Sequence, residues 1–273
     1  MTDSREQDTT WRSRGALFDR VAAGYLEGRP GYPQQVFDLL RDRCGLGQGT
    51  SLVEVGAGTG QATMPLLDAG AHVTAVEPGP DLADVLHART ADRDITIVVE
   101  RFEDAQLPEA SYDLVTSATA FHWVTPELGF PKAGRLLREN GWLALWWTIW
   151  GDPMGHDPLH EQLRPVLAAK APHLLDEGLA QGAYALDAPS RTAEITSSRL
   201  FGSVEQHTFR WTGHHTAAEA RALFASFSPF LALDEVLRNE LLDDLKTIVE
   251  ERFNGHVERP YVTVMYLAQR ESH

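Results

Sequence analysis

A short apolar run followed by a glycine-rich turn is the feature that most constrains this chain. Residues 51–55 read SLVEV, and glycines follow at alternate positions, Gly56, Gly58 and Gly60. β-Branched residues fit the pleated surface of a sheet, whereas glycines accept positive φ angles and let bare backbone approach a bound molecule. The stretch therefore predicts a buried strand whose carboxyl end faces a ligand.

The segments that follow alternate between strand-like and helix-like patterns. The predicted strands are 51–55, 72–77, 95–100, 112–117 and 142–150, and the predicted helices are 61–70, 81–90 and 128–140. Gly70 and Gly141 are expected to end the first and last of these helices. This alternation predicts a parallel sheet covered on both faces. The last strand agrees, because its residues are apolar on both faces.

The rhythm changes after residue 150. The stretch 151–200 looks helical, is broken by prolines and glycines, and offers no strand, whereas 203–211 and 261–270 regain strand character. We therefore expect an α/β fold, a Rossmann-like three-layer sandwich with a mostly parallel seven-stranded sheet and a helical lid insertion. The expected regions are a flexible tail (1–14), a core with N-terminal cover helices (15–150), a helical lid over the substrate site (151–200), and strands and helices completing the core (201–273).

Composition narrows the partners and the compartment. The chain has 24 Lys and Arg against 39 Asp and Glu, a formal net charge of −15, which argues against nucleic acid and anionic membranes. Its single cysteine, Cys44, excludes an intramolecular disulfide framework and fits a reducing compartment. No apolar stretch is long enough to span a bilayer. A cytoplasmic protein is expected.

A dinucleotide site is the first interpretation of the glycine turn to consider. The G-x-G-x-x-G fingerprint needs a third glycine for close helix packing, and Gln61 occupies that position. Glu54 precedes the turn by two residues, where a carboxylate is poorly placed beside a pyrophosphate but well placed beside a cationic ligand. Spacing and charge both disfavour NAD.

S-Adenosylmethionine (SAM) fits the same features, because it carries a sulfonium and an ammonium but no phosphate. The stretch VEVGAGTGQAT resembles the first motif of class I SAM-dependent methyltransferases, E/D-x-G-x-G-x-G. Glu77, 17 residues after Gly60, resembles the acidic residue that accepts both ribose hydroxyls in that family. The alternative for Glu77 is a cap for the following helix.

Three further stretches extend the resemblance over about residues 16 to 150. VVERFEDAQLP resembles the segment that contacts adenine, and SYDLVTSATAFHWV resembles the motif beside the methyl group. YLEGRPGYP resembles the cover segment of a subgroup with the patterns Y-x-x-x-R-P-x-Y-P and H-W, which acts on small molecules. The residues that the resemblance assigns to the cofactor are Tyr25, Arg29, Glu54, Gly56, Ala57, Gly58, Gly60, Gln61, Glu77, Pro78, Phe102, Glu103, Ser117 and Ala118.

The acceptor side is expected next to the fourth predicted strand. His122 follows that strand, and its imidazole is a candidate general base, with a role in shaping the pocket wall as the alternative. Tyr32, Trp123 and Trp147 are candidate substrate-binding residues, with core packing as the alternative for the tryptophans. For Tyr25, Arg29 and Tyr32, the alternative is an amphipathic N-terminal helix with an exposed arginine. No metal site is expected, because Pro158 disrupts the helical spacing of the nearby histidine pair and adjacent histidines cannot share one face.

The resemblance implies a SAM-dependent methyltransferase that releases S-adenosylhomocysteine. We expect transfer to a small-molecule acceptor through oxygen, nitrogen, carbon or a carboxylate, in specialised metabolism. Two alternatives keep the cofactor: a non-methylating reaction on the same fold, and a non-catalytic SAM binder. A nicotinamide oxidoreductase is the third alternative. The expected partner is a small molecule, with a homodimer left open.

Overall fold

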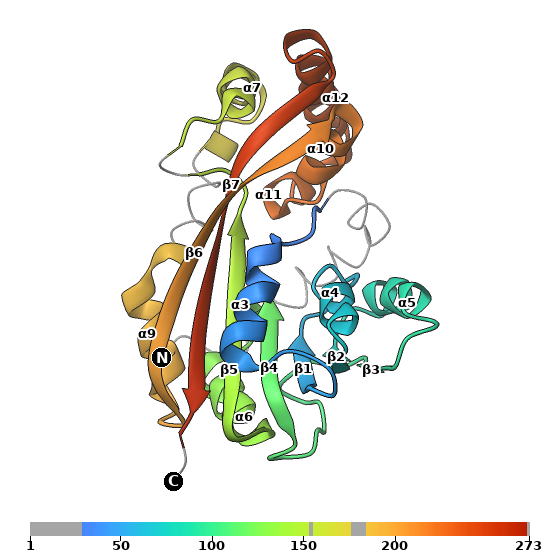
Figure 1. Ribbon diagram of the computed structural model, residues 1–273. Helices are drawn as coiled ribbons and strands as arrows, with labels where there is room; N and C mark the ends of the chain where they lie inside the picture. The colour runs from blue at the N-terminus through green and yellow to red at the C-terminus, as the bar shows by residue number, and fades with distance from the viewer. Residues whose placement is uncertain (1–28, 153–154, 176–183, 272–273) are drawn as a thin grey trace.

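The core of the molecule is one seven-stranded sheet in the order β3-β2-β1-β4-β5-β7-β6 (Figure 1). The computed structural model describes residues 29–152, 155–175 and 184–271, so the predicted tail at 1–14 and Tyr25 lie outside the described residues. The strands are β1 (Ser51–Val55), β2 (His72–Val76), β3 (Ile95–Val98), β4 (Tyr112–Ala118), β5 (Leu137–Ile149), β6 (Phe201–Thr216) and β7 (His256–Arg270).

The sheet is mixed. β1 to β5 pair with one another in parallel, whereas β7 is antiparallel to both β5 and β6. The seven predicted strands and the α/β character are confirmed. β6 at the edge of the sheet runs in the same direction as β5. β7 follows β6 in the chain and runs back between these two strands.

Helices cover both faces of this sheet and make a three-layer arrangement. One apolar core includes residues of α3 (Gln34–Cys44), α4 (Thr63–Asp68) and α5 (Pro80–Arg89), and the other includes residues of α6 (Pro126–Leu136) and α9 (Ala188–Ser197). β5 contributes to both cores, with Trp146 in the first and Leu145 and Trp147 in the second. The predicted burial of this strand on both faces is confirmed.

A third apolar core lies beyond the carboxyl ends of the parallel strands (Figure 1). It is enclosed by α7 (Pro158–Lys170), α10 (Ala217–Ala225), α11 (Ser228–Leu231) and α12 (Glu235–Arg252), which we call the helical cap. Fully buried side chains such as Leu163 on α7 and Leu245 on α12 hold it together. Because α10 to α12 connect β6 with β7, the long antiparallel pair carries the cap.

The range 151–200, expected as one lid, is distributed over two places in the structure. α7 packs within the helical cap, whereas Ile195 of α9 packs into the sheet core together with α6. The predicted end of a helix at Gly141 is wrong: α6 ends at Leu136, and β5 begins at Leu137. A register shift opposite Tyr112 and Leu114 lets β5 pair with β4 before that glycine.

Candidate cofactor and acceptor site

The three glycines after β1 all adopt positive φ angles, but they serve different contacts. Their φ values are 71°, 56° and 91° at Gly56, Gly58 and Gly60. A Cβ on Gly56 would lie 2.3 Å from Cβ of Ala120, and one on Gly60 would lie 2.7 Å from Cδ1 of Leu86. A Cβ on Gly58 would meet no described atom within 4 Å. Gly56 and Gly60 therefore allow Ala120 and Leu86 to pack closely against the turn. Of the three glycines, only Gly58 faces space that no described residue fills.

Glu54 lies beneath this turn. Its side chain is 1% exposed and accepts a hydrogen bond of 2.6 Å from the hydroxyl of Thr63 on α4. Burial raises the pKa of Glu54 to about 8, with a smaller contribution from the negative charge of Glu77. The carboxyl is therefore largely protonated at neutral pH in the absence of a nearby cation.

Gln61 lies on the other side of the turn. Its side-chain oxygen accepts a hydrogen bond of 2.9 Å from the hydroxyl of Thr59. Its amide nitrogen is buried and has no hydrogen-bond partner among the described residues. A buried donor without a partner is costly, so this nitrogen is suited to a ligand acceptor. Ala57, at the centre of the turn, is buried.

Glu77 directly follows β2 and reaches across to the turn. One carboxylate oxygen accepts from the backbone N–H of Gly58 at 2.8 Å, and the other accepts from the N–H of Gly79 at 2.9 Å. Both backbone groups belong to turns at the carboxyl edge of the sheet, and Pro78 lies between Glu77 and the second turn. The carboxylate is thus fixed beside Gly58, the glycine with open space.

The predicted adenine segment is placed closer to the core than the sequence suggested. Phe102 is 3% exposed, and its ring centroid lies 6.2 Å from that of Phe121. Glu103 accepts from the backbone N–H of Thr125 at 3.0 Å and forms an ion pair with Arg101 at 3.1 Å. Phe102 thus packs the loop after β3 against the 3₁₀ helix that contains Phe121, and Glu103 ties the same loop to the N-cap of α6. An adenine contact of either residue stays a prediction.

The end of β4 adjoins the turn. Ser117 is fully buried and donates to the carbonyl of Val55 at 2.8 Å, so its hydroxyl links β4 to β1. The next residue, Ala118, is partly exposed at the end of the strand. Tyr32 donates to the hydroxyl of Thr119 at 3.2 Å and contacts the ring of Trp146 edge-on. Tyr32 therefore covers the end of β4.

Arg29 is placed apart from this group. Its guanidinium donates to the side chain and the carbonyl of Ser226, both at 3.2 Å, and its guanidinium carbon lies 5.4 Å from the ring centroid of Trp150. These contacts join the N-terminal segment to the helical cap. A contact between Arg29 and the cofactor carboxylate stays a prediction.

His122 lies in a short 3₁₀ helix (Phe121–Trp123) after β4 and belongs to an aromatic cluster. Nδ1 of His122 accepts a hydrogen bond of 3.1 Å from the indole N–H of Trp147 on β5. The ring centroid of His122 lies 4.4 Å from that of Trp123 and 5.8 Å from that of Tyr184. An indole nitrogen only donates, so Nδ1 must accept, and the neutral imidazole carries its proton on Nε2.

The structure thus brings the glycine turn, Glu77, Gln61, Tyr32 and His122 to one edge of the sheet. Sequence reasoning missed Tyr184, which has no motif around it and reaches the site only through packing. Its ring centroid lies 5.6 Å from that of Trp147. Among the described residues, no group of three or more potential metal ligands is present. None of the described helices combines the length and apolar character needed to cross a bilayer.

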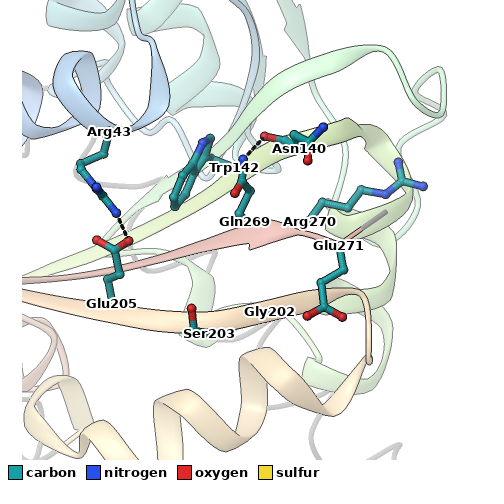
Figure 2. A pocket seen from close by; sticks show the side chains of 9 residues that line it. All are labelled: Arg43, Asn140, Trp142, Gly202, Ser203, Glu205, Gln269, Arg270 and Glu271. Atoms are coloured by element: carbon teal, nitrogen blue, oxygen red, sulfur yellow. Dashed lines mark hydrogen bonds and ion pairs between the residues drawn. The ribbon is translucent and has the colours of Figure 1, made fainter. Parts of the chain in front are cut away.

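A cavity of about 550 Å³ is present in another part of the sheet. Figure 2 shows the side chains that line it. Its lining includes Trp142 and Asn140 near the start of β5, and Arg43 over Trp142 forms an ion pair with Glu205. This end of β5 is opposite to the carboxyl edge of the parallel strands, where open α/β sheets bind ligands. The cavity is therefore separate from the candidate site.

Comparison with known proteins identifies the class of enzyme. The family described as "Methyltransferase domain" matches residues 53–145, which run from β1 to the middle of β5. The protein is a SAM-dependent methyltransferase. An uncharacterized methyltransferase of Mycobacterium tuberculosis is 28% identical over 258 residues, covering 93% of this chain and 95% of its own length. An uncharacterized methyltransferase-like protein of Schizosaccharomyces pombe is 27% identical over 266 residues, with 93% and 95% covered.

The fold of this methyltransferase has solved counterparts. Phosphoethanolamine N-methyltransferase 2 of Haemonchus contortus, in complex with SAM, superposes with a TM-score of 0.56 at 16% identity. The match covers 93% of this chain and 57% of that one, so the chain spans just over half of the parasite enzyme.

The described residues fit SAM as cofactor. Space is open at Gly58, the amide nitrogen of Gln61 has no partner among the described residues, and the Glu77 carboxylate lies at the same turn. Backbone without a side chain can approach the methionine arm, and a fixed carboxylate can accept hydroxyl groups. Glu54 would add negative charge beneath the turn if a bound cation lowered its pKa.

Proposed function

We propose that this methyltransferase transfers the methyl group of SAM to a small-molecule acceptor bound between the end of β4 and the aromatic cluster around His122. The observation that carries the proposal is the packing of Ala120 against Gly56, where an added Cβ would lie only 2.3 Å away. This packing puts the cofactor turn and the His122 loop in direct contact. A cofactor at Gly58 and an acceptor at His122 would therefore be neighbours.

In this proposal the glycine turn and Glu77 hold the cofactor, and Gln61 offers its amide N–H. SAM, when bound, supplies a methyl group already activated by the positive sulfonium for in-line transfer. The remaining tasks of the protein are to position the acceptor, exclude water and handle any proton that the acceptor loses. Tyr32 and the rings of Trp123 and Trp147 would form the walls that exclude water.

His122 is proposed to orient the acceptor by donating from Nε2. Because Trp147 occupies Nδ1, the lone pair that a base needs at Nε2 is absent in the neutral tautomer. A donor at this position favours an acceptor that is already an anion or that presents a lone pair. This orienting role replaces the proton-abstracting role that the sequence suggested as one of two alternatives.

The acceptor is expected to be partly apolar and of modest size, as compounds of specialised metabolism often are. Aromatic side chains dominate the described part of the proposed acceptor site. The proposal includes methyl transfer to an oxygen, nitrogen, carbon or carboxylate of the acceptor. The helical cap lies beyond the same edge of the sheet and is proposed to cover the acceptor.

A direct experiment would incubate the purified protein with SAM and fractionated small-molecule extracts. Mass spectrometry should detect a compound heavier by one methyl group, together with stoichiometric S-adenosylhomocysteine. Cofactor binding without S-adenosylhomocysteine release in any fraction would instead support a non-catalytic binder. Release of a different cofactor fragment would support a non-methylating reaction.

A further inference from the structure

Arg191 on α9 is a buried cation whose donors are only partly used. The residue is 6% exposed, and its Nη2 forms an ion pair with Glu194 at 2.6 Å. Its Nε and Nη1 are buried and have no hydrogen-bond partner among the described residues. Buried guanidinium donors are normally all satisfied, so two open donors on one side chain indicate a missing partner.

The ring of Tyr184 restricts where that partner can lie. The guanidinium carbon of Arg191 lies 3.5 Å from the Tyr184 ring centroid, a stacking contact that occupies one face of the guanidinium plane. Hydrogen bonds to a guanidinium form in its plane, so stacking leaves the edge donors available. The partner must therefore be an acceptor group that approaches the edge of the guanidinium.

The open donors lie close to the proposed acceptor site. Tyr184 contacts Arg191, and its ring centroid also lies 5.8 Å from that of His122 and 5.6 Å from that of Trp147. Tyr266 donates to the carbonyl of Ala185 at 2.7 Å and so fixes the backbone next to Tyr184. Arg191 is thus two ring contacts away from His122, within the length of a small organic molecule.

We propose that Arg191 binds a carboxylate of the methyl acceptor, so that the substrates of this enzyme are monocarboxylic acids with an apolar body. This inference rests on the proposed function and names its substrate class. A planar carboxylate matches the edge of a guanidinium in geometry and charge. A monoanion is favoured over a dianionic phosphate, because Glu194 already offsets part of the positive charge of Arg191.

The apolar body follows from the lining between Arg191 and His122. The partly exposed ring of Tyr184 is the apolar surface there, and it packs against the buried ring of Trp147. Rings favour flat or aliphatic groups over sugars. The proposal therefore selects aromatic acids as the first probes, and leaves open whether the carboxylate itself or another atom receives the methyl group.

The test uses the full-length protein saturated with S-adenosylhomocysteine. Benzoate, phenylacetate and cinnamate are each compared with the corresponding primary amide, and phenyl phosphate serves as the dianion. Ligand-observed NMR and calorimetry report binding independently of turnover. At least one acid should bind about tenfold or more tightly than its amide, the effect of a charge-assisted contact.

Two variants of Arg191 and one matched control locate the effect. Arg191→Met should lower the affinity for that acid about tenfold or more, and Arg191→Lys should restore it in part. Arg135→Met is the control, because Arg135 on α6 also pairs with a glutamate, Glu109 at 3.1 Å, but is exposed and belongs neither to the helical cap nor to the residues proposed for the acceptor site. This variant should bind the acid as the wild type does.

Several outcomes would overturn the proposal. They are equal binding of acids and amides, no binding by any acid, tighter binding of phenyl phosphate than of every acid, or unchanged affinity in a folded Arg191→Met protein. If that variant does not fold, the acid–amide comparison on the wild type and the Arg191→Lys result still decide. Failure of the wild type to bind S-adenosylhomocysteine would count against the proposed function itself, and is measured first.

Discussion

The indole N–H of Trp147 donates to Nδ1 of His122 over 3.1 Å, although the two residues are 25 positions apart in the chain. Trp147 is buried in the centre of the sheet, so this donor is held rigidly. The contact assigns the proton of the neutral imidazole to Nε2. A side chain that resembles a general base in the sequence is thereby set up to donate a hydrogen bond.

The first prediction separates donation from base catalysis at His122. The amide N–H of a glutamine can take the place of Nε2–H, whereas a phenylalanine only fills the space. His122→Gln should therefore retain methyl transfer to within about tenfold, and His122→Phe should lose about a hundredfold or more. Both rates are measured as S-adenosylhomocysteine release with saturating SAM.

A general base would give a different pattern. Both variants would then lose about 10²–10⁴-fold, and the rate would no longer depend on an ionisation near neutral pH. Affinity for SAM, measured by calorimetry, serves as the control and should be the same in both variants. Equal large losses with intact cofactor binding would refute the donor role.

The second prediction concerns the open space at Gly58. Gly58→Leu should leave the protein folded but remove most of its affinity for SAM, because the new side chain would occupy the space where cofactor meets backbone. Gly49→Leu is a matched control, since Gly49 also has a positive φ, 83°, and no described atom near an added Cβ. Both variants share the backbone strain, so only Gly58→Leu should change the calorimetric titration with SAM.

The third prediction concerns Glu77. Glu77→Ala should weaken SAM binding by about 1.5–3 kcal/mol, the range for hydrogen bonds to a charged group. Part of any loss could come from the turns that Glu77 holds at Gly58 and Gly79. Repeating the titration with a cofactor analogue that lacks the 2′-hydroxyl distinguishes the two causes. If Glu77 contacts the ribose, the substitution should cost less binding free energy for the analogue than for SAM. An identical loss for both ligands would show that Glu77 only holds the turns in place.

The fourth prediction concerns pH. Burial raises the pKa of Glu54 from 4.5 to about 8, so between these values the folded protein holds a proton that the unfolded chain has released. The stabilisation from Glu54 is complete below pH 4.5 and is lost as the pH rises towards 8. Glu54→Gln is neutral at every pH and can still accept from Thr63. The free energy of unfolding of the Glu54→Gln variant should therefore rise relative to that of the wild type, by up to about 1.4 kcal/mol per pH unit across this window.

Urea unfolding at several pH values measures this difference. A difference that stays flat with pH would mean that Glu54 is ionised in the folded protein at neutral pH.

Local sequence was sufficient for the features that depend on neighbouring residues. The strand before Gly56, the glycine turn and the acidic residue after the second strand are all set by short-range spacing, and the structure has β1 and β2 at the predicted places. The alternation of strand and helix also predicted the α/β fold, because only a sheet covered on both faces buries such strands.

Tertiary structure decided what depends on contacts between distant segments. The three glycines are alike in sequence, yet Gly56 is constrained by Ala120 and Gly60 by Leu86, while Gly58 faces open space. The helical cap combines α7 with helices that follow more than 45 residues later in the chain. Periodicity marks an apolar face but does not name the segment that covers it.

The same distinction holds for the chemistry. The sequence determined that a histidine follows the fourth strand, and that a glycine-rich turn precedes it. Packing across the sheet alone decided whether that histidine donates or accepts. It also decided that Arg191 is buried beside Tyr184 with two donors that have no partner among the described residues. A side chain's type is encoded at its own position, whereas its tautomer and its unsatisfied donors depend on every segment that folding brings against it.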